Sequence, residues 1–148
     1  MGPASGFYLA RPDEPSVYIT GDSVMTQHVR DAIERLQPDL IVAPAGAANF
    51  GIGRGILFSS EELVELAQLA PRDIVFNHLE ALDHCPTTRA GLRERMDAEG
   101  IGRRAFIPAD GELLDFQRHS TAPRALPKAS ISHHPGFQKW LTAKFAGT

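Results

Sequence analysis

Two short apolar runs constrain the fold of this chain more than any other feature. Residues 39–43 read Asp-Leu-Ile-Val-Ala and residues 73–77 read Asp-Ile-Val-Phe-Asn. Continuous apolar runs of this length are typical of strands that are buried on both faces, as in a parallel sheet. Because parallel strands need a crossover connection, usually a helix, the two runs predict an α/β fold.

Three segments have the pattern of the connecting helices. The first carries an apolar stripe at spacings of four, four and three residues, which is helix periodicity. The second begins with Ser59 and Glu62 at capping-box spacing. The third is capped by Thr87 or Thr88 and stops at Gly100. The stripe of the first segment consists of Met25, Val29, Ile33 and Leu36.

Short strands are expected at both ends of this alternating pattern. Residues 7–10 and 17–20 form the first pair, and residues 104–107 and 112–116 form the last, joined by a hairpin turn at Asp110-Gly111. The predicted order is therefore β-β-α-β-α-β-α-β-β.

The charge distribution divides the chain into two parts. Residues 1–116 hold ten arginines against all eighteen acidic residues, a net charge of −8, whereas residues 117–148 hold five basic residues and no acid. We interpret residues 1–116 as a folded domain and residues 117–148 as a basic tail. The tail contains a possible short amphipathic helix, whose apolar residues are Phe137, Trp140, Leu141 and Phe145.

Composition argues against several classes of protein. The net charge of −3 argues against a nucleic-acid-binding protein, which usually presents a basic face. No apolar run approaches the roughly 20 residues that span a membrane. A single cysteine, Cys85, rules out an intramolecular disulfide framework, and residues 1–10 have no signal-peptide pattern. We therefore expect a cytoplasmic location.

Asp22 and His78 each follow directly on a predicted strand. Ligands of open α/β sheets bind at the carboxyl ends of the strands, so both side chains are expected at one edge of the sheet. A carboxylate and an imidazole together suit zinc, manganese or iron. The alternatives are that Asp22 caps the helix that follows it, and that His78 is a loop histidine with a local hydrogen bond.

Other polar residues in the predicted loops are weaker candidates. Arg54 lies in a glycine-rich loop and is a candidate contact to an anionic substrate, while His84 and Cys85 are ligand types that follow His78 closely. We expect Cys85 to be a small buried side chain. Arg54, Glu80 and His84 are the residues we assign to substrate contacts or to support of the metal ligands.

Five segments in order resemble the metallo-β-lactamase superfamily, in particular its ascorbate-6-phosphate-lactonase-like branch. They are Gly6-Phe-Tyr-Leu, Val17-Tyr-Ile-Thr-Gly-Asp-Ser, Pro38-Asp-Leu-Ile-Val-Ala-Pro, Asn77-His-Leu-Glu-Ala-Leu-Asp-His-Cys and Ile107-Pro-Ala-Asp-Gly-Glu. The resemblance covers about residues 4–116 and implies the C-terminal half of an αββα sandwich.

The resemblance also implies a chemistry. Asp22 would be the carboxylate shared by two metal ions, zinc or else manganese or iron, and His78 would be the last histidine ligand. A metal-bound hydroxide would attack an ester, lactone or phosphoester bond of a small-molecule substrate. The His-x-His-x-Asp-His motif of that superfamily is absent from the sequence. The resemblance therefore implies a partial site, which we expect to be inactive by itself.

Half of a sandwich would also expose one apolar face of its sheet. At about 25 cal/mol per Å² of apolar surface, a few hundred Å² left uncovered costs several kcal/mol. We expect a missing N-terminal half, a second copy of the chain, or the tail around Trp140 to cover this face. Two alternatives to the hydrolase remain: a truncated or degenerate module that acts in binding or dimerisation, and a small α/β binding protein unrelated to metals.

Overall fold

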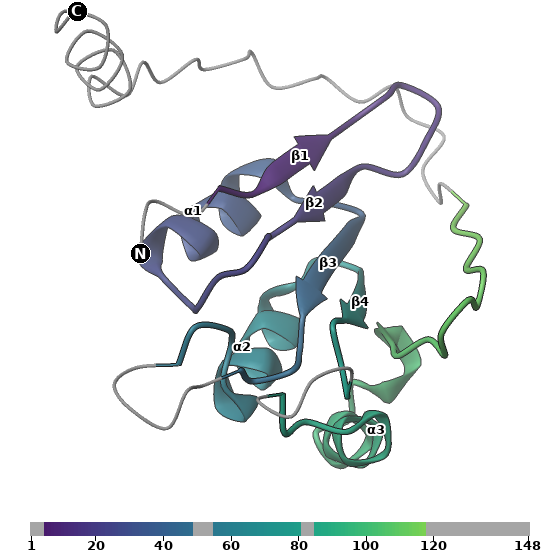
Figure 1. Ribbon diagram of the computed structural model, residues 1–148. Helices are drawn as coiled ribbons and strands as arrows, with labels where there is room; N and C mark the ends of the chain where they lie inside the picture. The colour runs from purple at the N-terminus through teal and green to yellow at the C-terminus, as the bar shows by residue number, and fades with distance from the viewer. Residues whose placement is uncertain (1–4, 49–54, 81–84, 118–148) are drawn as a thin grey trace, which may run out of the picture.

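The computed structural model describes residues 5–48, 55–80 and 85–117, which form a five-stranded sheet and three α-helices (Figure 1). The elements in chain order are β1 (Phe7–Leu9), β2 (Val17–Ile19), α1 (Gln27–Leu36), β3 (Leu40–Pro44), α2 (Ser60–Leu69), β4 (Asp73–Asn77), α3 (Arg89–Ala98), a 3₁₀ turn (Gly102–Arg104) and β5 (Ala105–Phe106). The predicted α/β class is confirmed, and both apolar runs are inner strands of the sheet.

The strands lie side by side in the order in which they occur in the chain. β1 pairs antiparallel with β2, and β2, β3, β4 and β5 pair parallel in succession. Each parallel connection contains a helix. Because such crossovers are right-handed and all step in one direction, they place α1, α2 and α3 on the same face of the sheet. Figure 1 shows α1 and α2 on the far side of the sheet.

One hydrophobic core fills the space between the sheet and the three helices. Ile41 on β3 pairs in register with Ile74 on β4, and both side chains are fully buried against the helices. Apolar side chains from every helix pack in the same cluster. The core therefore depends on alternate residues of β2, β3 and β4 that face the helices. Its members from the strands and helices include Tyr18, Val29, Ile33, Ala43, Leu63, Leu66, Phe76, Leu92 and Met96.

The helix starts agree with the capping patterns of the sequence. Ser59 and Glu62 form the predicted capping box: the Ser59 hydroxyl accepts from the Glu62 amide at 3.2 Å and the Glu62 carboxylate accepts from the Ser59 amide at 2.8 Å. Thr88 caps α3 by accepting from the Gly91 amide. Each cap satisfies backbone donors that have no partner inside the helix.

Replacing Ser59 with alanine is expected to destabilise the protein by about 1 kcal/mol, because the hydroxyl that accepts from the Glu62 amide is lost, while the backbone amide of residue 59 can still donate to the Glu62 carboxylate. Urea unfolding followed by circular dichroism measures the change. Ser60→Ala is the matched control, since Ser60 is exposed on the first turn of α2 and is not the cap. Equal effects of the two substitutions would contradict the prediction.

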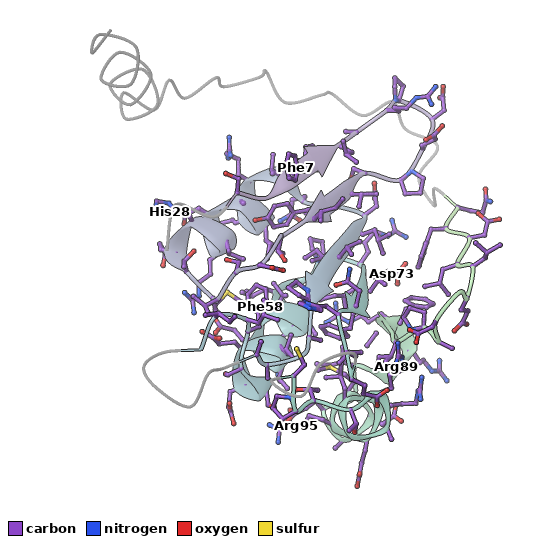
Figure 2. All side chains as sticks on the ribbon, in the orientation of Figure 1. Phe7, His28, Phe58, Asp73, Arg89 and Arg95 are labelled. Carbon is purple, nitrogen blue, oxygen red and sulfur yellow. The ribbon has the colours of Figure 1, made fainter. Side chains whose placement is uncertain are left out.

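The opposite face of the sheet carries apolar side chains that the helices do not cover. Phe7 and Leu9 on β1 are 63% and 58% exposed. They pair in register with Ile19 and Val17 on β2, and Ile19 in turn pairs with Val42 on β3. These five residues, Phe7, Leu9, Val17, Ile19 and Val42, are called the open face below. Figure 2 shows Phe7 on β1, at the margin of the sheet.

The predicted final strand over residues 112–116 is wrong. Residues 107–117 contain a turn in which the Glu112 amide donates to the Ala109 carbonyl at 3.1 Å, but no strand follows it (Figure 1, green). The carbonyls of Ile107 and Pro108, which a hairpin would use, instead accept from arginines of α3. Pro108 also has no amide to donate. The turn predicted at Asp110-Gly111 is therefore present, but the strand predicted to follow it and pair with β5 is not.

Instead of pairing with β5, the segment after the turn folds back over the sheet. The Phe116 ring packs edge-on against Phe106 of β5, with ring centroids 4.9 Å apart. Phe116 also lines a small cavity with Leu40 at the start of β3. This end of the sheet is partly covered by the chain itself, while the β1–β2 end is not. Apart from Gln117, the predicted tail lies outside the described residues.

Within the described parts of the chain, no helix has the length and apolar character needed to cross a membrane.

Candidate functional site

Asp22 and His78 lie at the same edge of the sheet, as the strand pattern predicts. His78 follows directly on β4, and Asp22 follows β2 after a two-residue turn in which Gly21 has φ +66°. The turn is held by the Thr20 amide, which donates to the Val42 carbonyl at 3.0 Å. Because β2 and β4 flank β3, their carboxyl ends are separated by one strand only.

The two side chains approach each other across the end of β3. His78 Nδ1 lies 4.0 Å from Asp22 Oδ1, and the side chains are 35% and 78% exposed. This separation is too long for a hydrogen bond. Two donors of a tetrahedral zinc ion, each about 2.0–2.2 Å from the metal, lie roughly 3.3–3.6 Å apart, so the two side chains would need to approach each other by a few tenths of an ångström to hold one ion. The carboxylate and imidazole therefore fit a metal ion in position and in chemistry.

The alternative reading of Asp22 as a helix cap is wrong. The N-cap of α1 is Thr26, whose hydroxyl accepts from the Val29 amide at 3.3 Å. Residues 22–25 separate Asp22 from the first turn of α1 and contain no regular structure. The Asp22 carboxylate therefore does not cap the start of a helix, and it is exposed to solvent beside His78.

A pocket of about 180 Å³ opens between the two candidate ligands. Its walls are Gly21, Asp22, Asn77 and His78, and its floor consists of Ile19, Val42 and Pro44. Two of the floor residues, Ile19 and Val42, belong to the open face. The pocket is therefore continuous with the uncovered side of the sheet, and a partner that covers the open face would reach the two ligands.

The loop that carries His78 has an uncommon backbone. His78 and Glu80 both have φ +57°, in the left-handed region, where a residue other than glycine is costly, by about 1 kcal/mol or more. Between them, Leu79 is buried in the hydrophobic core. The surrounding structure must hold such a conformation, and strained loops of this kind occur often at functional sites.

Gly46 helps to hold this loop in place, a role that the sequence patterns did not predict. The Ala45 amide donates to the Asn77 carbonyl at 2.9 Å, which brings the chain after β3 against the start of the loop. A Cβ atom on Gly46 would lie 2.6 Å from the His78 carbonyl oxygen and 2.9 Å from Cys85 Sγ. The backbone approach therefore requires glycine. Its signal in the sequence is a glycine two residues after a buried strand.

Gly46→Ala is expected to destabilise the protein by roughly 1–3 kcal/mol, because the His78 carbonyl is backbone and must shift to make room. Urea unfolding measures the loss of stability. Gly100→Ala is a control with open space at its Cβ, although its φ of +71° adds backbone strain of its own. NMR signals of His78 should move in the Gly46 variant and stay in place in the Gly100 variant. Unmoved His78 signals in Gly46→Ala would contradict the prediction.

Glu80, which the sequence suggested as a substrate contact or a support for the ligands, is paired with Arg89. Glu80 Oε2 accepts from Arg89 Nη1 at 2.7 Å, and its Oε1 accepts from the Arg89 backbone amide. The pKa of Glu80 is held below its usual value. The largest cause is the hydrogen bond from the Arg89 backbone amide, and the second is the hydrogen bond from the Arg89 guanidinium. Glu80 is thus an anion bound to the start of α3.

The remaining candidates lie apart or outside the described residues. Cys85 is buried as expected and packs with Ala48 and Leu57. Arg54 and His84 fall in the parts of the chain that the structure does not describe, as does His133-His134 in the tail. Within residues 5–48, 55–80 and 85–117, no three His, Cys, Asp or Glu side chains gather as a metal site would need. The described residues therefore bring together two candidate ligands, Asp22 and His78.

The sequence is similar to a longer bacterial protein. It is 30% identical over 118 residues to UPF0173 protein YddR of Bacillus subtilis, and the match covers 78% of this chain and 46% of that protein. No protein-family profile matches the sequence.

Solved structures of longer hydrolases share the fold. An isothiocyanate hydrolase from Delia radicum gut bacteria matches 76% of this chain and 44% of its own, with a TM-score of 0.72 and 32% identity. A possible metal-dependent hydrolase from Veillonella parvula matches 75% and 43%, with a TM-score of 0.70 and 28% identity. A metallo hydrolase from the archaeon Ignicoccus hospitalis, at 16% identity and a TM-score of 0.56, shares the fold alone.

These matches agree with the predictions from the sequence in two respects: the similar structures include an isothiocyanate hydrolase and a possible metal-dependent hydrolase, and each match covers less than half of the longer protein. The chain therefore shares its fold with longer hydrolases, and it spans less than half the length of the relatives that it matches.

Proposed function

We propose that this chain supplies part of the active site of a metal-dependent hydrolase, with Asp22 and His78 as metal ligands. The observation that carries the proposal is the 4.0 Å approach of Asp22 Oδ1 and His78 Nδ1 at the carboxyl edge of the sheet, beside an open pocket. The similarity to hydrolases, one of them described as metal-dependent, supports the same conclusion.

Each side chain has a defined task in this proposal. The Asp22 carboxylate, exposed and beyond the end of β2, would bind one metal ion or be shared by two. The His78 imidazole would bind from the strained loop, which limits its movement and fixes the direction from which it approaches. When bound, the metal lowers the pKa of a water molecule and polarises the scissile bond of an ester, lactone or phosphoester. Zinc, manganese and iron all accept this donor set.

The site needs more ligands than the described residues bring together. A catalytic zinc ion usually has three protein ligands, and the described residues bring two together. The pocket floor is continuous with the open face, so whatever packs on Phe7, Leu9, Val17, Ile19 and Val42 would also reach the ions. We propose that this partner corresponds to the remaining length of the relatives, with a second copy of the chain as the alternative.

A second function is favoured by the exposed apolar surface itself. Phe7 and Leu9 are two residues apart on β1, so they lie on the same face of the strand, and both are more than half exposed. Exposed apolar side chains that lie together are typical of a surface that binds protein. Without further ligands the chain would act as a non-catalytic module that binds or dimerises through the open face. This function requires the face and does not require Asp22 or His78.

Elemental analysis of the purified chain, together with its mass in solution, separates the two functions. The chain is analysed alone and after co-expression with the part of UPF0173 protein YddR that it does not match. The hydrolase proposal expects a complex with stoichiometric zinc, manganese or iron that hydrolyses at least one member of a panel of esters, lactones, phosphoesters and isothiocyanates. Assembly without bound metal would overturn it and favour the binding module.

A further inference from the structure

Arg89, the first residue of α3, makes contacts to two other segments, and one of them is the loop that carries His78. Its Nη1 donates to Glu80 Oε2 at 2.7 Å, and its Nε donates to the Pro108 carbonyl at 2.8 Å. Its Nη2 donates to the Asp110 carboxylate, and its backbone amide donates to Glu80 Oε1. The guanidinium therefore joins the loop after β4, the start of α3 and the turn after β5.

These contacts act on the loop at the point where its backbone is most constrained. Glu80 is two residues from His78, and both residues have φ +57°. Leu79, between them, is fixed in the core, so the loop is anchored on the inside by an apolar side chain and on the outside by the two oxygens of Glu80. Gly46 has no Cβ, which lets the His78 carbonyl lie against the chain that follows β3. With Glu80 bound, the loop has little freedom to turn the His78 ring away from Asp22.

We propose that Arg89 is a positioning residue for His78, which acts through Glu80 and does not touch the metal or the substrate. The inference rests on the proposed function, because only a ligand role gives the orientation of His78 a purpose. The planar guanidinium suits the task, since it donates in several fixed directions at once, whereas a lysine ammonium is a point charge on a flexible stem.

A surface ion pair on the same helix provides a matched control. Arg95 Nη2 lies 3.0 Å from Glu99 Oε1, four residues further along α3, and contacts no segment of the site in the described structure. Figure 2 labels both arginines, which lie on different sides of α3. If Arg89 were an ordinary surface pair, its removal would have the same small effects as removal of Arg95.

The first measurement uses the metal-free chain. NMR signals of the His78 ring and amide are compared in the wild type, Arg89→Ala, Arg89→Lys, Glu80→Gln and Arg95→Ala, with His28 on α1 as an internal reference. The proposal expects His78 signals to move in the Arg89 and Glu80 variants, less in Arg89→Lys than in Arg89→Ala, and to stay unchanged in Arg95→Ala. His78 signals that remain at their wild-type positions in folded Arg89→Ala and Glu80→Gln would overturn it.

The second measurement is a Zn²⁺ titration of the chain assembled with the remainder of its relative. Removal of a side chain that supports a metal ligand typically weakens metal binding by about 10- to 100-fold, and this is the loss expected for Arg89→Ala and Glu80→Gln but not for Arg95→Ala. Unchanged Zn²⁺ affinity in variants that remain folded would count against Arg89. Absence of Zn²⁺ binding by the wild type would overturn the proposed function, while the metal-free NMR result would still decide the role of Arg89.

Discussion

His78→Ala is expected to weaken metal binding by the assembled protein by more than about 100-fold, and Asp22→Asn to do so comparably. Loss of a direct ligand costs more than the 10- to 100-fold that follows removal of a supporting side chain. Asparagine keeps the shape of Asp22 but removes the charge that attracts a divalent cation. Calorimetric titration with Zn²⁺ measures both losses.

Neither substitution should unfold the chain. The Asp22 side chain is 78% exposed and the His78 side chain 35% exposed, and surface substitutions usually change stability by less than about 0.5 kcal/mol. His28→Ala on α1 is the matched histidine control, because His28 is exposed and does not line the pocket between Asp22 and His78. If His28→Ala and His78→Ala lower Zn²⁺ affinity equally, or if neither candidate ligand matters, the assignment of the site is wrong.

Phe76→Ala is expected to destabilise the chain by roughly 3–5 kcal/mol, the range for a large aromatic side chain removed from a core. Phe76 lies on β4 and is fully buried between the sheet and the helices. A loss of this size is comparable with the whole stability of a small domain. Urea unfolding of the purified chain should therefore show a large fall in the midpoint, or no folded protein at all.

Phe7→Ala provides the contrast within the same sheet. Phe7 is 63% exposed, so the same substitution should change the stability of the isolated chain by less than about 0.5 kcal/mol. If a partner covers the open face, the Phe7 variant should assemble less tightly, which sedimentation or light scattering would detect. A large loss of stability in the isolated Phe7→Ala chain would show that this face is already covered.

The parts of the fold that the sequence predicted are those set by short-range patterns. The runs at residues 39–43 and 73–77 are continuous apolar segments between helix signals, and they correspond to the inner strands β3 (Leu40–Pro44) and β4 (Asp73–Asn77). Ser59 and Glu62 gave the start of α2 because a capping box is read from two residues only. The Asp22–His78 pair was expected at one sheet edge because parallel strands all end there.

The features that the sequence did not predict depend on contacts between distant segments. The hairpin at residues 112–116 was wrong because arginines of α3, Arg89 and Arg93, take the carbonyls it would need. The capping alternative for Asp22 failed because Thr26, four residues later, makes that hydrogen bond. The approach of Gly46 to the His78 carbonyl depends on how two loops pack, and no pattern along the chain specifies that distance.

The strand order described above also has a consequence for how the protein folds. Since each strand is added beside the one made before it, no later segment has to be threaded between strands already paired. Each parallel pairing therefore has to close only the one helical crossover that joins its two strands, and the cost of closing these crossovers, which makes parallel sheets slow to form, is met one strand at a time.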